Sequence, residues 1–372
     1  PTAAKQTLVS TPDRHLVFFG TETTIGTTST QDAMYIRWSD QEDINTYTPT
    51  ATNTAGTQRI ADGTRIVGAI RGRDAIYVWT DNAMFIMRFV GAPFTFSFQQ
   101  VGTGCGLIGK NAAVEVDGSA YWMSENGFFR YTGKLESLAC LVEDYVYDDL
   151  NTVPRQHINA GLKNLFGEVT WFYASSGSDT VDRAVTYNYM DSTAERPVWT
   201  TSSLDRTAWQ DSAVFGKPHA TDYDDDATSD STVGNTDGVS IYYEHETGQN
   251  QVKAGTETAI AASIESGDFD VTRTQEGTTL QGEGEYIMKI RRILPDFLSQ
   301  TGDARVTLNL KNYPTDSQVS SSLGPFTSTT STTKIDTIAR ARAISLKIDN
   351  TSTGQHWKLG TFRLDVQADG RR

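Results

Sequence analysis

The sequence is dominated by short apolar segments joined by tight turns, with very little helical periodicity. In one unit, two apolar segments over residues 75–89 flank the turn Thr80-Asp81-Asn82. Another unit spans residues 112–123 around Asp117-Gly118. Two apolar segments around a short Asp or Asn turn are typical of a β-hairpin. The pattern therefore predicts an all-β protein built mostly from antiparallel hairpins.

The hairpin units recur at a spacing of roughly 40 to 50 residues, which is the range of propeller blades. A later unit combines 168–173 with 183–189 and again carries Trp and Tyr. One small sheet cannot bury both of its faces alone, whereas sheets stacked around an axis can. The spacing favours a β-propeller, and a large β-sandwich, which uses the same strand signals, is the alternative. One short helix is expected between units, at residues 142–150.

The composition changes at two points along the chain. Residues 221–238 are polar, acidic and rich in turn formers, and we interpret them as an exposed loop. Beyond about residue 263, strand segments alternate apolar and polar residues, as strands with one buried face do. We predict a β-propeller-like domain over residues 1–263 and a β-sandwich platform domain over residues 264–372. Within the second domain, the Ser- and Thr-rich residues 317–333 are expected to form a long loop.

The net charge of −14 limits the partners of this chain. An acidic protein is repelled by nucleic acid unless it carries a local basic face. It could nevertheless line a conduit through which DNA slides without adhering. The hydrophobic fraction of 37% and the charged fraction of 21% are those of a globular protein.

Terminal and cysteine features add further expectations. The first residue is Pro1, and we expect additional sequence to precede it. We find no charged-then-apolar leader and no run of 18 apolar residues, so neither a signal peptide nor a membrane span is expected. Cys105 and Cys140 are interpreted as buried free thiols, with a bridge between them as the less favoured alternative.

The sequence shows no motif for catalysis, cofactor binding or metal binding, and we predict that the chain is not an enzyme. Nucleophilic and zinc chemistry needs positioned His or Cys groups. No such motif surrounds the five histidines, which are His15, His157, His219, His245 and His356. The acidic residues 222–226 resemble part of a calcium loop, but they lack the glycine and the closing glutamate, so a solvated loop is favoured.

Two groups of side chains have both a structural and a functional interpretation. Aromatic residues such as Trp79, Trp122 and Trp199 could stack on sugars, but strand aromatics usually belong to a core. A set of basic residues in the second domain could bind nucleic acid, although charge pairing with an acidic neighbouring subunit is favoured. These basic residues are Lys289, Arg291, Arg292, Arg340, Arg342, Arg371 and Arg372.

Several segments together resemble the tail nozzle proteins of short-tailed bacteriophages, the family of tail tubular protein B and the packaged-DNA stabilisation proteins. The resemblance covers most of the chain except about residues 155–255. The matching segments are 35–44, 47–56, 78–81, 91–96, 108–114, 121–124, 142–146, 264–270, 324–327 and 357–372.

This resemblance implies a propeller and a β-rich platform within a structural virion protein of the tail. It implies a sixfold ring below the portal and adaptor, an axial channel for DNA ejection, and contacts to tail fibres or spikes. We expect Asp and Glu rather than Lys and Arg to line the channel. The alternative is a propeller on the virion surface that binds or cleaves host glycans, for which paired carboxylates in a deep axial pocket would be the sign.

Overall fold

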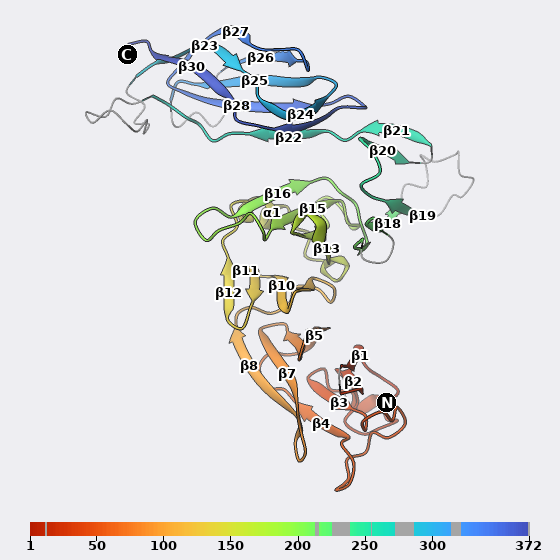
Figure 1. The fold of residues 1–372 in the computed structure, drawn as a ribbon. Helices are drawn as coiled ribbons and strands as arrows, with labels where there is room; N and C mark the ends of the chain where they lie inside the picture. Colours follow the sequence, from red (N-terminus) through yellow and green to blue (C-terminus); the bar gives the residue numbers. More distant parts are fainter. Residues whose placement is uncertain are drawn as a thin grey trace. The chain divides into compact units, whose positions relative to one another are not determined.

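The computed structural model describes residues 1–11, 13–212, 216–224, 239–253, 255–271, 286–313 and 321–370 (Figure 1). Within these residues the chain is all-β, as predicted, and its one α-helix is α1 (Glu143–Asp149). Two compact units are present, Pro1–Glu246 and Thr247–Arg372. The sequence places the division later, at 263/264, and the structure groups the hairpin of β20 (Asn250–Lys253) and β21 (Thr256–Ala259) with the second unit.

The first unit is a series of small antiparallel sheets, each made of strands that are consecutive in the sequence. We call these sheets blades 1 to 5, the first four with four strands and the fifth with three. Blades 1 and 2 contain β1 (Gln6–Ser10), β2 (His15–Phe19), β3 (Tyr35–Trp38), β4 (Gly56–Arg59), β5 (Ile66–Arg71), β6 (Ile76–Thr80), β7 (Ala83–Gly91) and β8 (Thr95–Thr103). Blades 3 to 5 contain β9 (Ala113–Val116), β10 (Ser119–Ser124), β11 (Gly127–Tyr131), β12 (Leu135–Leu138), β13 (Asn159–Lys163), β14 (Glu168–Tyr173), β15 (Arg183–Asn188), β16 (Val198–Ser202), β17 (Ala208–Gln210), β18 (His219–Asp224) and β19 (Val239–Glu244).

The blades are stacked as in a β-propeller. The first strand of each blade packs against the first strand of the next, so that β1 contacts β5, β5 contacts β9, β9 contacts β13 and β13 contacts β17. Among the described residues, no extensive packing joins β17 back to β1. The first unit is therefore a propeller-like series of blades.

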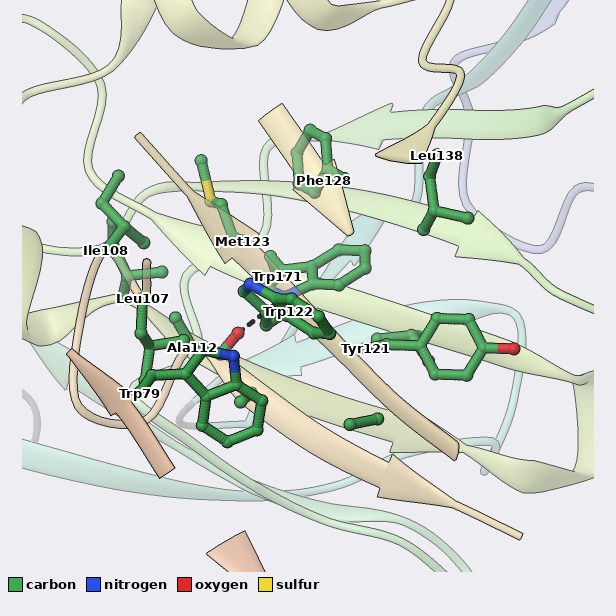
Figure 2. Packing of buried hydrophobic residues seen from close by; sticks show 14 of the residues in the cluster. Trp79, Leu107, Ile108, Ala112, Tyr121, Trp122, Met123, Phe128, Leu138 and Trp171 are labelled. Atoms are coloured by element: carbon green, nitrogen blue, oxygen red, sulfur yellow. Dashed lines mark hydrogen bonds between the residues drawn. The ribbon is translucent and has the colours of Figure 1, made fainter. Parts of the chain in front are cut away.

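A tryptophan at the same place in three successive blades anchors the packing between them. Trp79, Trp122 and Trp171 lie in the second strands β6, β10 and β14, and all three are fully buried. Figure 2 shows their rings among the aliphatic residues of the connecting segments. Trp171 donates its indole N–H to the carbonyl of Ala112 (3.0 Å), and Trp122 donates to Cys105 (2.8 Å). These bonds fix the segments that connect one blade to the next.

The face of blade 1 that points away from blade 2 is covered by loops of blade 1 itself. The side chain of Phe18 on this face packs edge-on against Tyr47 at 5.4 Å. Arg37 is 4% exposed and donates to the carbonyls of Glu22 (3.3 Å), Thr23 (2.8 Å) and Tyr47 (3.3 Å). These loops shield the polar and aromatic groups on this face of blade 1 from solvent.

The start of the chain is held by the buried carboxylate of Glu22. This carboxylate accepts the backbone N–H groups of Thr2 (2.8 Å), Ala3 (2.8 Å) and Gly26 (2.9 Å). Burial by itself raises the pKa of Glu22, but these donors outweigh it and lower the pKa to about 2. The N-terminal segment is thereby fixed next to the loop that caps blade 1.

The second unit contains two antiparallel sheets that share one aliphatic core. One sheet has the strand order β22-β28-β25-β26 and the other has β27-β23-β30. Val306, Leu308 and Ile344 from the first sheet pack with Met288 and Ile290 from the second. The strands, including the separate β24–β29 ribbon, are β22 (Ala262–Glu265), β23 (Met288–Leu294), β24 (Phe297–Thr301), β25 (Ala304–Lys311), β26 (Ser321–Ser328), β27 (Ile335–Ala341), β28 (Ala343–Asn350), β29 (His356–Leu359) and β30 (Arg363–Ala368). This is the predicted β-sandwich.

Two segments predicted as loops contain strands. Residues 221–224 belong to β18, which pairs with β19, whereas residues 225–238 lie outside the described residues. Within the predicted loop 317–333, residues 321–328 form β26, an edge strand paired with β25. Both loop predictions were based on polar composition and were wrong for these residues. A polar segment still forms a strand where a neighbouring strand offers backbone groups for hydrogen bonding.

Candidate assembly interface

Blade 2 carries a hairpin that is much longer than the blade itself. Strands β7 and β8 each have nine residues, whereas β6 has five and pairs with β7 only from Met84 to Met87. Residues 88–97 therefore extend beyond the body of the blade, as the β7–β8 hairpin does in Figure 1. We call residues 88–97 the finger.

The finger exposes large apolar side chains. Phe94, at its tip, is 76% exposed, and Val90 is 51% exposed. Phe89 is also exposed. Apolar groups gathered on one projecting element are typical of a surface that contacts a partner, whereas singly scattered ones are not.

One side of the finger, close to its tip, is fixed against blade 1. Thr95 donates its hydroxyl to the carbonyl of Thr54 (3.1 Å), and the ring of Phe96 meets that of Trp38 edge-on at 5.3 Å. The imidazole of His15 lies 5.7 Å from the Phe89 ring and 5.1 Å from the Phe96 ring. These contacts hold the finger in a defined direction. Its apolar tip is therefore already ordered, and binding a partner would cost little conformational entropy.

His15 is a buried polar group in this support. The ring atom Nε2 lies 3.1 Å from the hydroxyl of Thr54, which itself donates to Asp40 (2.6 Å). The Thr54 hydroxyl therefore accepts from the Nε2–H group of His15. Burial lowers the pKa of His15, against the opposing influence of the carboxylates of Asp13 and Asp40. His15 positions the finger, a role that its sequence context does not indicate.

Three exposed arginines lie at the end of blade 2 from which the finger projects. Arg71 and Arg73 belong to the β5–β6 turn, and Arg88 is the first residue of the finger. Among the described residues, no carboxylate lies within ion-pairing distance of these three guanidinium groups. The finger is thus an apolar tip on a positively charged base, in a chain of net charge −14.

Of the other histidines, His245 has the most structured surroundings. Arg206, which is 2% exposed, donates from Nε to Nε2 of His245 (3.0 Å) and lies over the Tyr243 ring at 3.8 Å. Burial, followed by the positive charges of Arg206 and Lys163, lowers the pKa of His245 to about 4. This arrangement connects β19 to the segment before β17, and it is not visible in the sequence because Arg206 belongs to no motif.

The remaining candidates from the sequence are spread over the molecule. Trp79 and Trp122 are core residues, as interpreted, and Trp199 donates its indole N–H to the carbonyl of Ala139 (2.8 Å). Cys105 is a buried free thiol, and Cys140 is free but only partly buried. His157, His219 and His356 lie on separate elements.

The acidic residues 222–226 are only partly described. Asp222 is buried in β18, and Asp225 and Asp226 lie outside the described residues. In the part of the chain that the structure describes, no group of three or more His, Cys, Asp or Glu side chains is placed to hold a metal ion. No helix among these residues is long and apolar enough to cross a membrane.

Part of the basic set in the second unit is paired within the chain. Arg292 bonds Asp336 (2.8 Å), and Arg340 bonds Asp369 (2.6 Å). Arg291 is exposed at a β-bulge of β23, and Arg371 and Arg372 lie outside the described residues. Intramolecular pairing therefore accounts for two charges that the sequence analysis assigned to a neighbouring subunit.

An open depression in the second unit does not resemble a site with two catalytic carboxylates. It is lined by residues 295–300 together with Thr329, Thr330 and Thr332. Asp296 is its one acidic residue, and its carboxylate accepts the backbone N–H of Thr361 (2.9 Å). Glycoside hydrolysis usually requires a second carboxylate across the bond that is cleaved.

Comparison with known proteins gives little guidance to function. No family model matches the chain, and no curated protein matches it. The similar solved structures include a crystal structure of a glycoside hydrolase family 43 arabinoxylan arabinofuranohydrolase from Bacillus subtilis in complex with cellotetraose. That structure is 9% identical, with a TM-score of 0.24, over 96% of this chain and 94% of the other.

This similarity corrects one prediction. From the sequence we predict that the chain is not an enzyme, and that prediction is contradicted because the similar structure is itself a hydrolase. The prediction failed because it was drawn from the lack of short motifs, and a glycosidase needs only two carboxylates that can lie anywhere in the sequence. A TM-score of 0.24 assigns no substrate and no residue to this chain. The resemblance to tail nozzle proteins stays a prediction.

Proposed function

We propose that this chain is a ring-forming structural subunit of a bacteriophage tail nozzle or hub, located in the virion tail. In this proposal six copies surround a channel that continues the DNA path below the portal and adaptor. The ring also anchors tail fibres or spikes. A structural role of this kind is compatible with a catalytic activity in the same chain.

The finger is the observation that carries this proposal. Phe96 of the finger belongs to the core that blades 1 and 2 share, but Phe94 at the tip is 76% exposed and adds nothing to that core. Such an element is explained by a partner that covers it in an assembly. The segments that resemble the nozzle family include residues 91–96, which contain the tip of the finger.

The net charge fits the proposed passage of DNA. A wall with an excess of Asp and Glu repels the phosphate backbone, so DNA would pass through without adhering. We expect the purified assembly to bind duplex DNA weakly and with little dependence on salt. Tight binding that falls steeply as salt rises would indicate a channel lined by Lys and Arg, which contradicts this part of the proposal.

The proposal is tested by the mass and symmetry of the purified protein. Light scattering and averaged electron images should show a closed ring, or a tail density in which this chain repeats about an axis. A chain that stays monomeric, alone and when mixed with the other tail proteins, would overturn the proposal. That outcome would direct attention to the binding or cleavage of host glycans at the virion surface.

A further inference from the structure

Helix α1 exposes a face whose chemistry is complementary to that of the finger. Leu141, just before the helix, is 77% exposed, and Tyr145 is 56% exposed. Asp144 and Asp148 are exposed as well. Within the helix, Asp144, Tyr145 and Asp148 are spaced i, i+1 and i+4, which places them on one side. Leu141 lies directly before the N-cap residue and completes this set of four exposed residues. We call them the α1 face.

The acidic groups of the α1 face are available for a partner. Among the described residues, no Lys or Arg lies within ion-pairing distance of Asp144 or Asp148. The buried side of the helix is anchored by Val146, which is fully buried, and by Tyr147, whose hydroxyl donates to the carbonyl of Ser124 (2.6 Å). The α1 face is therefore fixed in place and turned outward.

The finger and the α1 face lie at opposite ends of the blades. The hydroxyl of Tyr77 in blade 2 donates to the carbonyl of Gly118, which places the β9–β10 turn at the finger end. Helix α1 lies at the other end of blade 3, because Tyr147 bonds Ser124 at the β10–β11 turn. The six residues of β10 span about 20 Å at roughly 3.3 Å per residue. A finger cannot reach the α1 face of its own chain across that length.

We propose that the finger of one copy docks on the α1 face of a second copy, an inference that rests on the proposed ring. Phe94 and Val90 would cover Leu141 and Tyr145, and the arginines at the base of the finger would pair with the two aspartates. A cation beside the ring of Tyr145 gains further attraction from its π-face.

Charge complementarity favours a second copy as the occupant. In the described part of the chain, the arginines at the base of the finger have no carboxylate partner, and Asp144 and Asp148 of the α1 face have no basic partner. Each surface supplies the charges that the other lacks, with exposed apolar groups beside them. Because the two surfaces differ and lie at opposite ends, the contact is head-to-tail, the type that generates a closed ring when the rotation closes.

Charge reversal tests this contact in the full chain. One variant carries Arg71→Glu, Arg73→Glu and Arg88→Glu, and the other carries Asp144→Lys and Asp148→Lys. We expect each variant alone to self-associate at least tenfold more weakly than the wild type in sedimentation. An equimolar mixture should assemble again, because in an alternating ring with an even number of copies every finger then faces an α1 face of opposite charge.

Two controls separate the contact from general charge and from folding. The first control combines Arg291→Glu, Lys358→Glu and Arg363→Glu, all at exposed residues of the second unit. It changes the net charge by the same amount as the triple arginine variant and should leave association unchanged. Asp148→Lys alone places a cation in the last turn of α1, where the helix dipole favours it. Weaker association of this variant, with unchanged circular dichroism, cannot come from loss of the helix.

Cross-linking distinguishes failure of this contact from failure of the ring. One tagged copy carries Phe94→Cys and a second, differently tagged copy carries Tyr145→Cys, both with Cys140→Ser. A disulfide between the two copies supports the contact even if no closed ring is seen, which would overturn only the proposed ring. A ring that forms without this cross-link and is insensitive to charge reversal overturns the contact and leaves the proposed function standing. A chain that neither associates nor cross-links overturns both.

Discussion

The cores of the two units are filled by different kinds of side chain. In the first unit the largest fully buried residues are aromatic and include Trp79, Trp122 and Trp171. In the second unit, as far as it is described, every buried hydrophobic residue is aliphatic or Met, with Leu308 and Ile344 among them.

This difference follows from the shapes of the spaces that are filled. Large rings reach from one blade to the next, as Trp79 and Trp122 of neighbouring blades do with their centroids 5.3 Å apart. Two sheets stacked face to face lie about 10 Å apart, a gap that aliphatic side chains fill by interdigitating. A blade thus depends on its neighbours, whereas the sandwich contains its whole core between its own two sheets.

The largest expected effect is that of removing one of the rings between blades. Trp122→Ala deletes contacts with Trp79 (5.3 Å between ring centroids) and Phe129 (5.8 Å), together with the bond to the Cys105 carbonyl. We expect a loss of about 3–5 kcal/mol in the free energy of unfolding. In hydrogen exchange of the intact chain, protection should fall in blades 2 and 3 together.

Leu308→Ala in the second unit is the matched comparison. It should cost about 2–5 kcal/mol, and the loss of protection should stay within the two sheets of the sandwich. If Trp122→Ala raised hydrogen exchange only within β10, the blades would be independent of one another. The claim that a blade, unlike the sandwich, depends on its neighbours would then be wrong.

A smaller effect is expected from acid, and it should fall on the first unit. The pKa of His245 is lowered from 6.5 to about 4, so the folded state disfavours the protonated form. The contribution of His245 to the free energy of unfolding is fully present above pH 6.5. It is lost as pH falls from 6.5 towards 4, because the unfolded chain takes up the proton at a higher pH than the folded chain. Allowing for partial exposure of the ring, we expect the loss at pH 4.5 to be about 1–2 kcal/mol.

His245→Gln isolates this contribution. The amide oxygen of the glutamine can still accept from Arg206 but is not protonated in this range. Between pH 7 and pH 4.5, the free energy of unfolding of this variant, measured by denaturant melts, should therefore fall less than that of the wild type. His356→Gln, at an exposed position in the second unit, is the control and should leave the pH dependence unchanged. An equal change in both variants would mean that the pH dependence does not come from the buried site.

The repeating hairpins were predictable because local turn chemistry fixes them. Asp117-Gly118 marks the β9–β10 turn, and Gly118 has a φ of +87°, which glycine adopts without strain. The short helix at 142–150 and the alternating strands of the sandwich were also recovered. These elements depend on periodicity and on turn residues, both of which are visible in a single sequence.

The finger and the cap of blade 1 could not be predicted in the same way. The apolar residues Phe89, Val90 and Phe94 are visible in the sequence, but the point where pairing with β6 stops, at Met87, is not. The two terminal nitrogens of Arg37, in contrast, donate to carbonyls of two loops that meet only in the folded chain. Such contacts depend on tertiary structure, which periodicity does not encode.

The smallest effect should come from a charge pair on the sandwich. Arg305 bonds both carboxylate oxygens of Asp349 at 2.7 Å across β25 and β28. Arg305→Lys keeps the charge but loses the two-bonded geometry, which only the planar guanidinium provides. Because solvent reaches the Arg305 side chain, we expect a loss below about 1 kcal/mol in denaturant melts, and high salt should reduce it further. A loss as large as that of Leu308→Ala would show that the sandwich relies on this pair as much as on its aliphatic core.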